Sequence, residues 1–158
     1  MVPKQLRRTD TLLAGLGLLA LLLALSTTLR AGENVLLNGA VEEATQGQPH
    51  EPRFWTADAW GTVEAEFDYI KDGESGWGLR VEVTSVDGGD AKWISDYVEI
   101  GDAYALLVGD SYRGDGESSL LVQAIGKEGE SLWLSASVVG PADQWGEARG
   151  LVQLPEWT

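Results

Sequence analysis

An alternation of apolar and acidic residues over residues 60–70 constrains the fold more than any other stretch of the sequence. Four apolar side chains take every second position and three carboxylates stand between them, namely Val63, Ala65, Phe67 and Tyr69, and Glu64, Glu66 and Asp68. Successive side chains of a β-strand point to opposite faces of its sheet, so this spacing gives one apolar and one charged face. The stretch therefore predicts a half-buried strand of an antiparallel sheet.

Comparable stretches recur along the chain after residue 31, where no helical period of convincing length appears. Strands are expected over residues 34–37, 60–70, 79–83, 91–100, 104–112, 118–125, 132–139 and 145–154. Turns are expected where Asn or Asp meets Gly and where charged residues cluster with Gly, at residues 38–39, 71–76 and 87–90. Strands at a spacing of about ten residues predict an all-β chain folded as an antiparallel β-sandwich.

Residues 1–31 differ in character from the rest of the chain. Lys4, Arg7 and Arg8 precede an uncharged stretch of 19 residues, 11–29, whose strongly apolar part ends at Leu25. A basic flank before such a helical stretch is typical of a signal peptide or a membrane anchor, and its length leaves both alternatives open. A signal peptide would be cut after Ala31, whereas an anchor would remain in the membrane. In either case the remainder of the chain is expected to be extracellular or at the cell surface.

The composition of residues 32–158 limits their partners and their architecture. This part keeps 7 of the 11 basic residues and 24 of the 25 acidic ones, a net charge of −17 at neutral pH. Nucleic acid and anionic lipid surfaces would repel such a charge, so the only membrane contact expected is through the N-terminal segment. The chain has no Cys, and 127 residues suffice for one core without disulfides. One domain is therefore expected over residues 32–158.

Two short motifs stand near the start of this domain. Asn34-Val35-Leu36-Leu37-Asn38-Gly39-Ala40-Val41-Glu42 precedes Pro52-Arg53-Phe54-Trp55. Together they resemble the N-terminal signature of the xylan- and glucan-binding carbohydrate-binding modules with a galactose-binding-like β-sandwich. Later segments are similar to the family in the same order, at residues 75–81 and 91–95, at Tyr104 and at Trp145. The resemblance implies a jelly-roll sandwich, and because the family carries closing strands, residues 32–158 are expected to lack the last one or more.

Non-catalytic binding of a polysaccharide or glycan is the function that the resemblance implies. Enzymatic activity is not expected, because the chain has no Cys and its single His, His50, has no neighbouring nucleophile motif. Acidic residues are so numerous that a pair of carboxylates carries no catalytic signal, although a catalytic domain could follow Thr158. The alternative function is that of a structural or adhesion sandwich that binds another protein and uses its aromatic residues for packing.

Sugar-binding residues are sought among the aromatic side chains, because indole faces stack on pyranose rings while polar neighbours bind the hydroxyl groups. Leu132 and Leu134 form the apolar face of their strand, so Trp133 is expected on the other face, beside Gln123 of the preceding strand. Three further candidates, at a strand end and in the loop after Trp55, are Tyr112, Arg113 and Trp60. The resemblance implies structural roles for Trp55, Trp77, Trp93 and Trp145.

A structural Ca²⁺ ion is also implied by the resemblance, since modules of this type carry one near their N-terminal strand. Glu42 matches the acidic ligand of the family, and the loop that begins at Asp72 resembles the loop that supplies others. Carboxylate and main-chain oxygens are the ligands that Ca²⁺ prefers. The expected closing strand would add a further Asp. From the residues alone, Glu42 can equally be an ordinary carboxylate at a turn.

Overall fold

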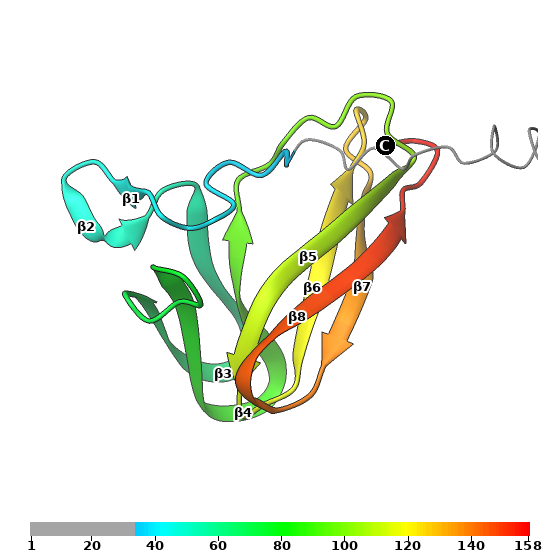
Figure 1. Ribbon diagram of the computed structural model, residues 1–158. Helices are drawn as coiled ribbons and strands as arrows, with labels where there is room; N and C mark the ends of the chain where they lie inside the picture. Colours follow the sequence, from blue (N-terminus) through cyan, green and yellow to red (C-terminus); the bar gives the residue numbers. More distant parts are fainter. Residues whose placement is uncertain (1–33) are drawn as a thin grey trace, which may run out of the picture. The chain divides into compact units, whose positions relative to one another are not determined.

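The computed structural model describes residues 34–158, and all of their secondary-structure elements are β-strands (Figure 1). The predicted signal or anchor segment, residues 1–31, lies outside this described part. The chain divides into two units between Asn34 and Val35, and residues 35–158 form the second of them. Within residues 34–158 the structure contains no helix of the length and apolar character that crossing a membrane requires.

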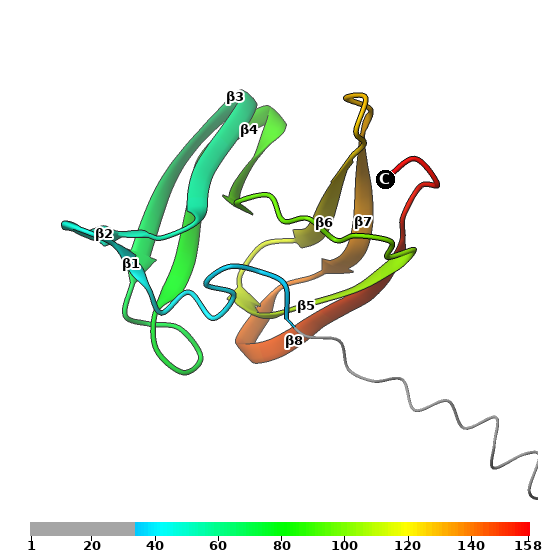
Figure 2. The same cartoon turned by 90° about the horizontal axis from the view of Figure 1, so that it is seen from above.

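In residues 34–158, eight strands form four antiparallel two-stranded ladders. They are β1 (Ala44–Thr45) with β2 (Gln48–Pro52), β3 (Trp55–Ile70) with β4 (Gly78–Ser95), β5 (Ala105–Gly114) with β8 (Ala142–Gln153), and β6 (Ser118–Ile125) with β7 (Ser131–Val139). The predicted all-β, antiparallel class is thus confirmed, and the arrangement is consistent with a β-sandwich. Figure 2 shows the β5–β8 and β6–β7 ladders beside each other, with β3–β4 as a separate long hairpin.

The β3–β4 hairpin bends back on itself at a corner made of glycines (Figure 1). Gly61, Gly88 and Gly89 have φ angles of 81°, 132° and 118°, and a Cβ at Gly61 would collide with the Gly88 carbonyl. Only glycine fits such a close approach at positive φ. As a result the two limbs of the hairpin meet, and the Trp93 Nε1–H donates to the Arg80 carbonyl at 3.1 Å.

The turn predicted over residues 87–90 is wrong. Gly88 and Gly89 remain paired with Thr62 and Gly61, so β4 continues through this stretch as one strand. The pair of glycines bends the ladder instead of ending it, because glycine permits positive φ, and the register shifts at a bulge between Thr62 and Val63 while the pairing continues beyond it.

The first predicted strand, residues 34–37, is also wrong. Residues 34–37 form no strand; a turn begins at residue 37, and the Val41 N–H donates to the Asn38 carbonyl at 2.9 Å. The Asn38 amide group donates to the carbonyls of Glu43 and Arg53 at 2.9 Å each, and its oxygen accepts from the Glu43 N–H at 3.0 Å. Asn38 therefore uses its side chain to tie the loop together, and this local bonding replaces a strand ladder.

The hydrophobic core of the described residues is small, and most of it lies in the part formed by β5 to β8. The hydrophobic side chains that are buried in the described residues are Tyr69, Ala124, Ala148 and Val152. Ala148 and Val152 come from β8 and Ala124 from β6. The β7 and β8 backbones also touch, because a Cβ at Gly150 would collide with the Ala136 carbonyl. Small residues at these positions let the two ladders approach closely.

Candidate functional site

Gln123 and Trp133 are direct cross-strand partners on β6 and β7, as the alternation predicts. Their neighbours on the ladder, Ala124 and Leu132, are paired on the opposite face. Trp133 keeps 44% of its surface exposed. Gln123 is held by two hydrogen bonds, accepting from the Tyr97 hydroxyl at 2.8 Å and donating to the Ser131 Oγ at 3.0 Å. The pair therefore presents an accessible indole beside a fixed amide.

Lys92 brings residues of β3 and β4 to this indole. Its ammonium nitrogen lies 5.8 Å from the centroid of the Trp133 ring, within the range of a cation–π interaction. The same nitrogen forms ion pairs with Asp90 Oδ1 at 2.5 Å and with Asp58 Oδ2 at 3.1 Å. Asp90 is in turn the cross-strand partner of Trp60, whose indole helps to lower the pKa of the Asp90 carboxyl. We call Asp58, Trp60, Asp90, Lys92 and Trp133 the Lys92 cluster.

The register of the β3–β4 ladder explains this grouping. Trp60 is paired with Asp90 and Asp58 with Lys92, so all four side chains point to the same face. Trp60 was predicted both as the first residue of a strand and in the loop after Trp55; it lies within β3, where 60% of its surface is exposed, so the strand is confirmed and the loop is wrong. Its exposure follows from the alternation, which places it on the face of the acidic residues.

The charges in the cluster stabilise one another. Burial alone would raise the pKa of the Asp90 carboxyl, but hydrogen bonds from Lys92 and Trp60 hold that pKa below its usual value. Burial alone would lower the pKa of the Lys92 ammonium, but the hydrogen bonds to Asp90 and Asp58 raise this pKa above its usual value. The Lys92 side chain is only 19% exposed, whereas both carboxylates remain accessible. A ligand at this surface would thus meet carboxylate oxygens in a fixed arrangement.

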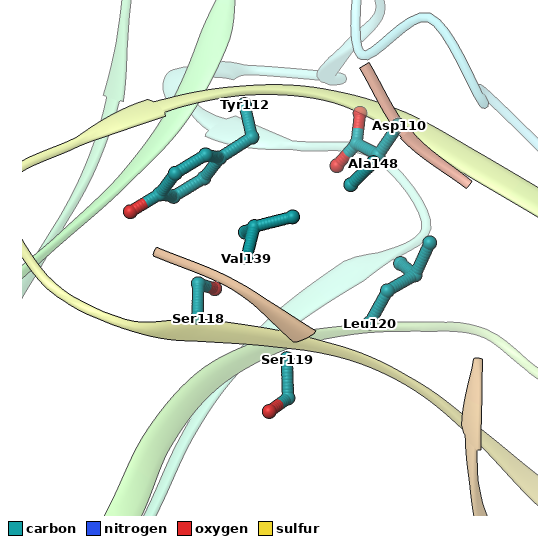
Figure 3. A pocket seen from close by; sticks show the side chains of 7 residues that line it. All are labelled: Asp110, Tyr112, Ser118, Ser119, Leu120, Val139 and Ala148. Atoms are coloured by element: carbon teal, nitrogen blue, oxygen red, sulfur yellow. The ribbon is translucent and has the colours of Figure 1, made fainter. Parts of the chain in front are cut away.

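Tyr112 and Arg113 lie apart from the Lys92 cluster and on opposite faces of β5. Tyr112 lines a small hollow of about 70 Å³ with Asp110 and Leu120, on the face of β6 opposite to Gln123 (Figure 3). Arg113 pairs with Asp72 at 2.7 Å and lies over the Trp145 ring, 4.9 Å from its centroid. The structure does not bring these two predicted residues to Trp133.

Asp110 points into the hollow that Tyr112 lines (Figure 3). Its carboxylate keeps access to solvent, but the walls of the hollow crowd it. This burial raises the pKa of Asp110, although the hydrogen bond from the Ser111 N–H at 2.8 Å acts in the opposite direction. A carboxyl group with a raised pKa marks a candidate site, but the hollow holds no second titratable carboxyl or basic group to act with it.

Glu42 and Asp72, the predicted calcium ligands, have other partners in the structure. Glu42 Oε1 accepts from the Trp77 N–H at 3.1 Å, and Asp72 is paired with Arg113. Among residues 34–158 no group of three or more His, Cys, Asp or Glu side chains is arranged to hold a metal ion. Calcium binding therefore stays a prediction from the resemblance alone.

The four tryptophans with expected structural roles are all partly buried. Trp77 stacks on Tyr69 with ring centroids 4.4 Å apart, and the Trp55 Nε1–H donates to the Asn38 carbonyl at 3.1 Å. Trp55 and Trp93 in addition line a groove on the inner side of the bent hairpin. That groove could not be predicted from the sequence, because it depends on the glycine corner.

No protein-family model, curated protein or solved structure matches this chain. The function is therefore inferred from the site. The Lys92 cluster combines two exposed indoles with carboxylates, an ammonium and, at its edge, the Gln123 amide and the Tyr97 hydroxyl. Such a surface can stack on a ring and bind hydroxyl groups, and among these residues no nucleophile and base are paired for covalent catalysis.

Proposed function

We propose that residues 34–158 form a non-catalytic carbohydrate-binding domain of the jelly-roll, galactose-binding-like type, carried outside the cell or on its surface. The ligand is a polysaccharide or glycan, and the binding surface is the Lys92 cluster together with Gln123 and Tyr97. The observation that best supports this proposal is that the Lys92 ammonium lies against the exposed Trp133 indole and also pairs with Asp90, which is the cross-strand partner of the exposed Trp60.

The chemistry of this surface suits a sugar better than an apolar partner. The apolar face of a pyranose stacks on an indole, and its hydroxyl groups both donate and accept hydrogen bonds. Asp58 and Asp90 supply acceptors, and their accessibility leaves them within reach of a ligand. Lys92 holds these carboxylates in place, so that little conformational entropy is lost on binding.

The test is a binding measurement on the full-length chain with soluble xylans and glucans. A polyoxyethylene detergent, which contains neither a sugar nor a choline group, keeps the apolar N-terminal segment in solution. The change in tryptophan fluorescence on addition of each polysaccharide gives the affinity, with bovine albumin as the control protein. Binding of at least one polysaccharide is expected, and absence of binding to the whole panel would contradict the proposal.

Two variants and a matched control assign the site. Trp60→Ala and Trp133→Ala are each expected to weaken binding about tenfold or more, the loss typical of a central aromatic contact. Trp157→Ala is the control, because Trp157 is also exposed, at 37%, but has no part in the Lys92 cluster. Equal losses in all three variants would show that the fluorescence change does not report on this site.

The second candidate function, a sandwich that binds another protein, is favoured by one apolar surface. Leu107 of β5 and Leu151 of β8 are cross-strand partners, and 67% and 68% of their surfaces are exposed. Paired exposed leucines of this kind mark protein interaction surfaces. Replacement of both by Ser should leave polysaccharide binding unchanged under the first proposal. The second function would be favoured if the parent protein bound no polysaccharide and the doubly substituted protein lost its cell-surface partners.

A further inference from the structure

The inner side of the bent β3–β4 hairpin forms a groove of about 400 Å³, on the opposite face of the ladder from the Lys92 cluster. Three aromatic rings, those of Trp55, Phe67 and Trp93, line it, as does Ala57, the cross-strand partner of Trp93. His50 and Glu51 of β2 complete its rim. A groove of this volume is within the range of small-molecule sites.

Both indoles of the groove are fixed by hydrogen bonds that point away from a ligand. The Trp55 Nε1–H donates to the Asn38 carbonyl, and the Trp93 Nε1–H donates to the Arg80 carbonyl, each at 3.1 Å. The Phe67 and Trp93 rings stand at 90° to each other with centroids 5.7 Å apart, so two walls of the groove are perpendicular aromatic rings. The groove thus offers ring surfaces to a ligand, and its indole donors are already satisfied.

This arrangement is less suited to a sugar than the Lys92 cluster is, because hydroxyl groups need donors and acceptors at the ligand. It is suited to an organic cation. The π-electrons of aromatic rings attract a positive charge, and a quaternary ammonium group is apolar enough to enter a groove lined by rings. Glu51, whose Oε1 accepts from Gln48 Nε2 at 3.1 Å, is the acidic residue that lines the groove, and the net charge of −17 on residues 32–158 favours approach of a cation.

We propose that the groove formed by Trp55, Phe67 and Trp93 is a binding site for a trimethylammonium cation such as choline. The rings surround the methyl groups, and Glu51 supplies the opposite charge. The site is separate from the Lys92 cluster, and it does not depend on the carbohydrate-binding proposal.

The test is calorimetric titration of the full-length chain with choline, tetramethylammonium and 3,3-dimethylbutan-1-ol. The last compound is the neutral carbon analogue of choline, so it has the same shape without the charge. Both cations are expected to bind, and the neutral analogue is expected to bind about fivefold or more weakly, the contribution of a partly desolvated cation–π interaction. Failure of both cations to bind would overturn the proposal. Equal affinities for choline and its neutral analogue would do so as well, because the groove would then be merely apolar.

Variants of the lining residues separate a ligand site from a structural role. Phe67→Leu keeps an apolar side chain but removes the ring, and it should weaken choline binding about fivefold while leaving binding of the neutral analogue unchanged. Ala57→Leu should fill the groove and abolish binding. Its control is Ala59→Leu, since Ala59 lies two residues further along β3 on the same face but does not line the groove. Loss of choline binding in both alanine variants would contradict the assignment.

The charge at the rim is tested in the same way. Glu51→Gln should weaken binding of both cations about twofold to threefold and leave the neutral analogue unaffected, as expected for an exposed charge. Glu66→Gln, an exposed carboxylate further along β3, is the matched control. Trp133→Ala should retain choline binding, and Ala57→Leu should retain polysaccharide binding. A negative result for one of the two ligands therefore leaves the test of the other ligand unaffected.

Discussion

Lys92 of β4 lies against the indole of Trp133 of β7, with its ammonium nitrogen 5.8 Å from the ring centroid. The two residues belong to different ladders, and their contact joins the β3–β4 hairpin to the β6–β7 ladder. The hydrogen bond from the Tyr97 hydroxyl to Gln123 at 2.8 Å makes a second connection at the same place. The proposed sugar site is therefore located where the two ladders meet.

Replacement of Lys92 by Met should destabilise the domain and weaken polysaccharide binding together. The change leaves the Asp58 and Asp90 carboxylates without their common partner, and it removes the cation from Trp133. A loss of about 1–2 kcal/mol in the free energy of unfolding is expected. Urea denaturation measures it, with Lys127→Met as the control because Lys127 is exposed in the β6–β7 turn. Lys92→Arg should recover much of the loss. An effect no larger than that of the Lys127 variant would show that the ion pairs contribute nothing.

The contribution of this cluster to stability should be constant across the neutral range and lost at both extremes. Because the pKa of Asp90 is lowered in the folded state, its contribution is present above its unfolded value of about 3.9 and is lost as the pH falls below it. The raised pKa of Lys92 has the opposite sign, so its contribution is lost only as the pH rises above about 10.4. The difference in unfolding free energy between the parent and Lys92→Met, measured against pH, should show this plateau. A steady slope through pH 7 would contradict it.

Asp110→Asn should stabilise the domain at neutral pH. The raised pKa of Asp110 means that the folded state favours its protonated form, so the ionised carboxylate opposes folding above the folded pKa. Asn keeps an acceptor for the Ser111 N–H and has no charge. Melting temperatures of the two proteins should differ at pH 7 and converge as the pH falls toward about 4. An asparagine variant that melts below the parent at pH 7 would show that the carboxylate is not strained by its surroundings.

Gly61→Ala should open the glycine corner and cost about 2 kcal/mol or more in unfolding free energy. The substitution combines a positive φ of 81° with a collision against the Gly88 carbonyl. Gly146→Ala in β8 is the control, since a Cβ there meets no atom within 4 Å. Denaturant titration of both variants gives the comparison. Equal stabilities would mean that the bend does not depend on Gly61.

Alternation in the sequence was enough to predict the class of the fold and the faces of several strands. It placed Gln123 and Trp133 together because only local strand pairing was needed. It failed at residues 34–37, where the Asn38 side chain bonds to the backbone in place of a ladder, and at residues 87–90, where two glycines bend a strand without ending it.

The membership of the Lys92 cluster could be predicted only in part. Trp60 and Trp133 were candidates as aromatic residues. The i, i+2 spacing of Asp58 with Trp60 and of Asp90 with Lys92 could have placed them on common faces, but the register that pairs the two strands was not visible in the sequence. The contact with Trp133 depends on how separate ladders pack, as does the separation of Tyr112 and Arg113 from this site.

We infer that the Trp133 indole binds a ligand and is not part of the core. The most direct measurement is polysaccharide affinity and urea denaturation on Trp133→Ala, with Trp77→Ala as the comparison because Trp77 stacks on the buried Tyr69. Truncation of a buried Trp lowers the free energy of unfolding by about 3–5 kcal/mol. A large part of this decrease is expected for Trp77→Ala. Trp133→Ala should lose less than about 1 kcal/mol of unfolding free energy and about tenfold or more in affinity. A Trp133→Ala protein that unfolds as readily as the Trp77 variant, or that binds polysaccharide as tightly as the parent, would contradict the account.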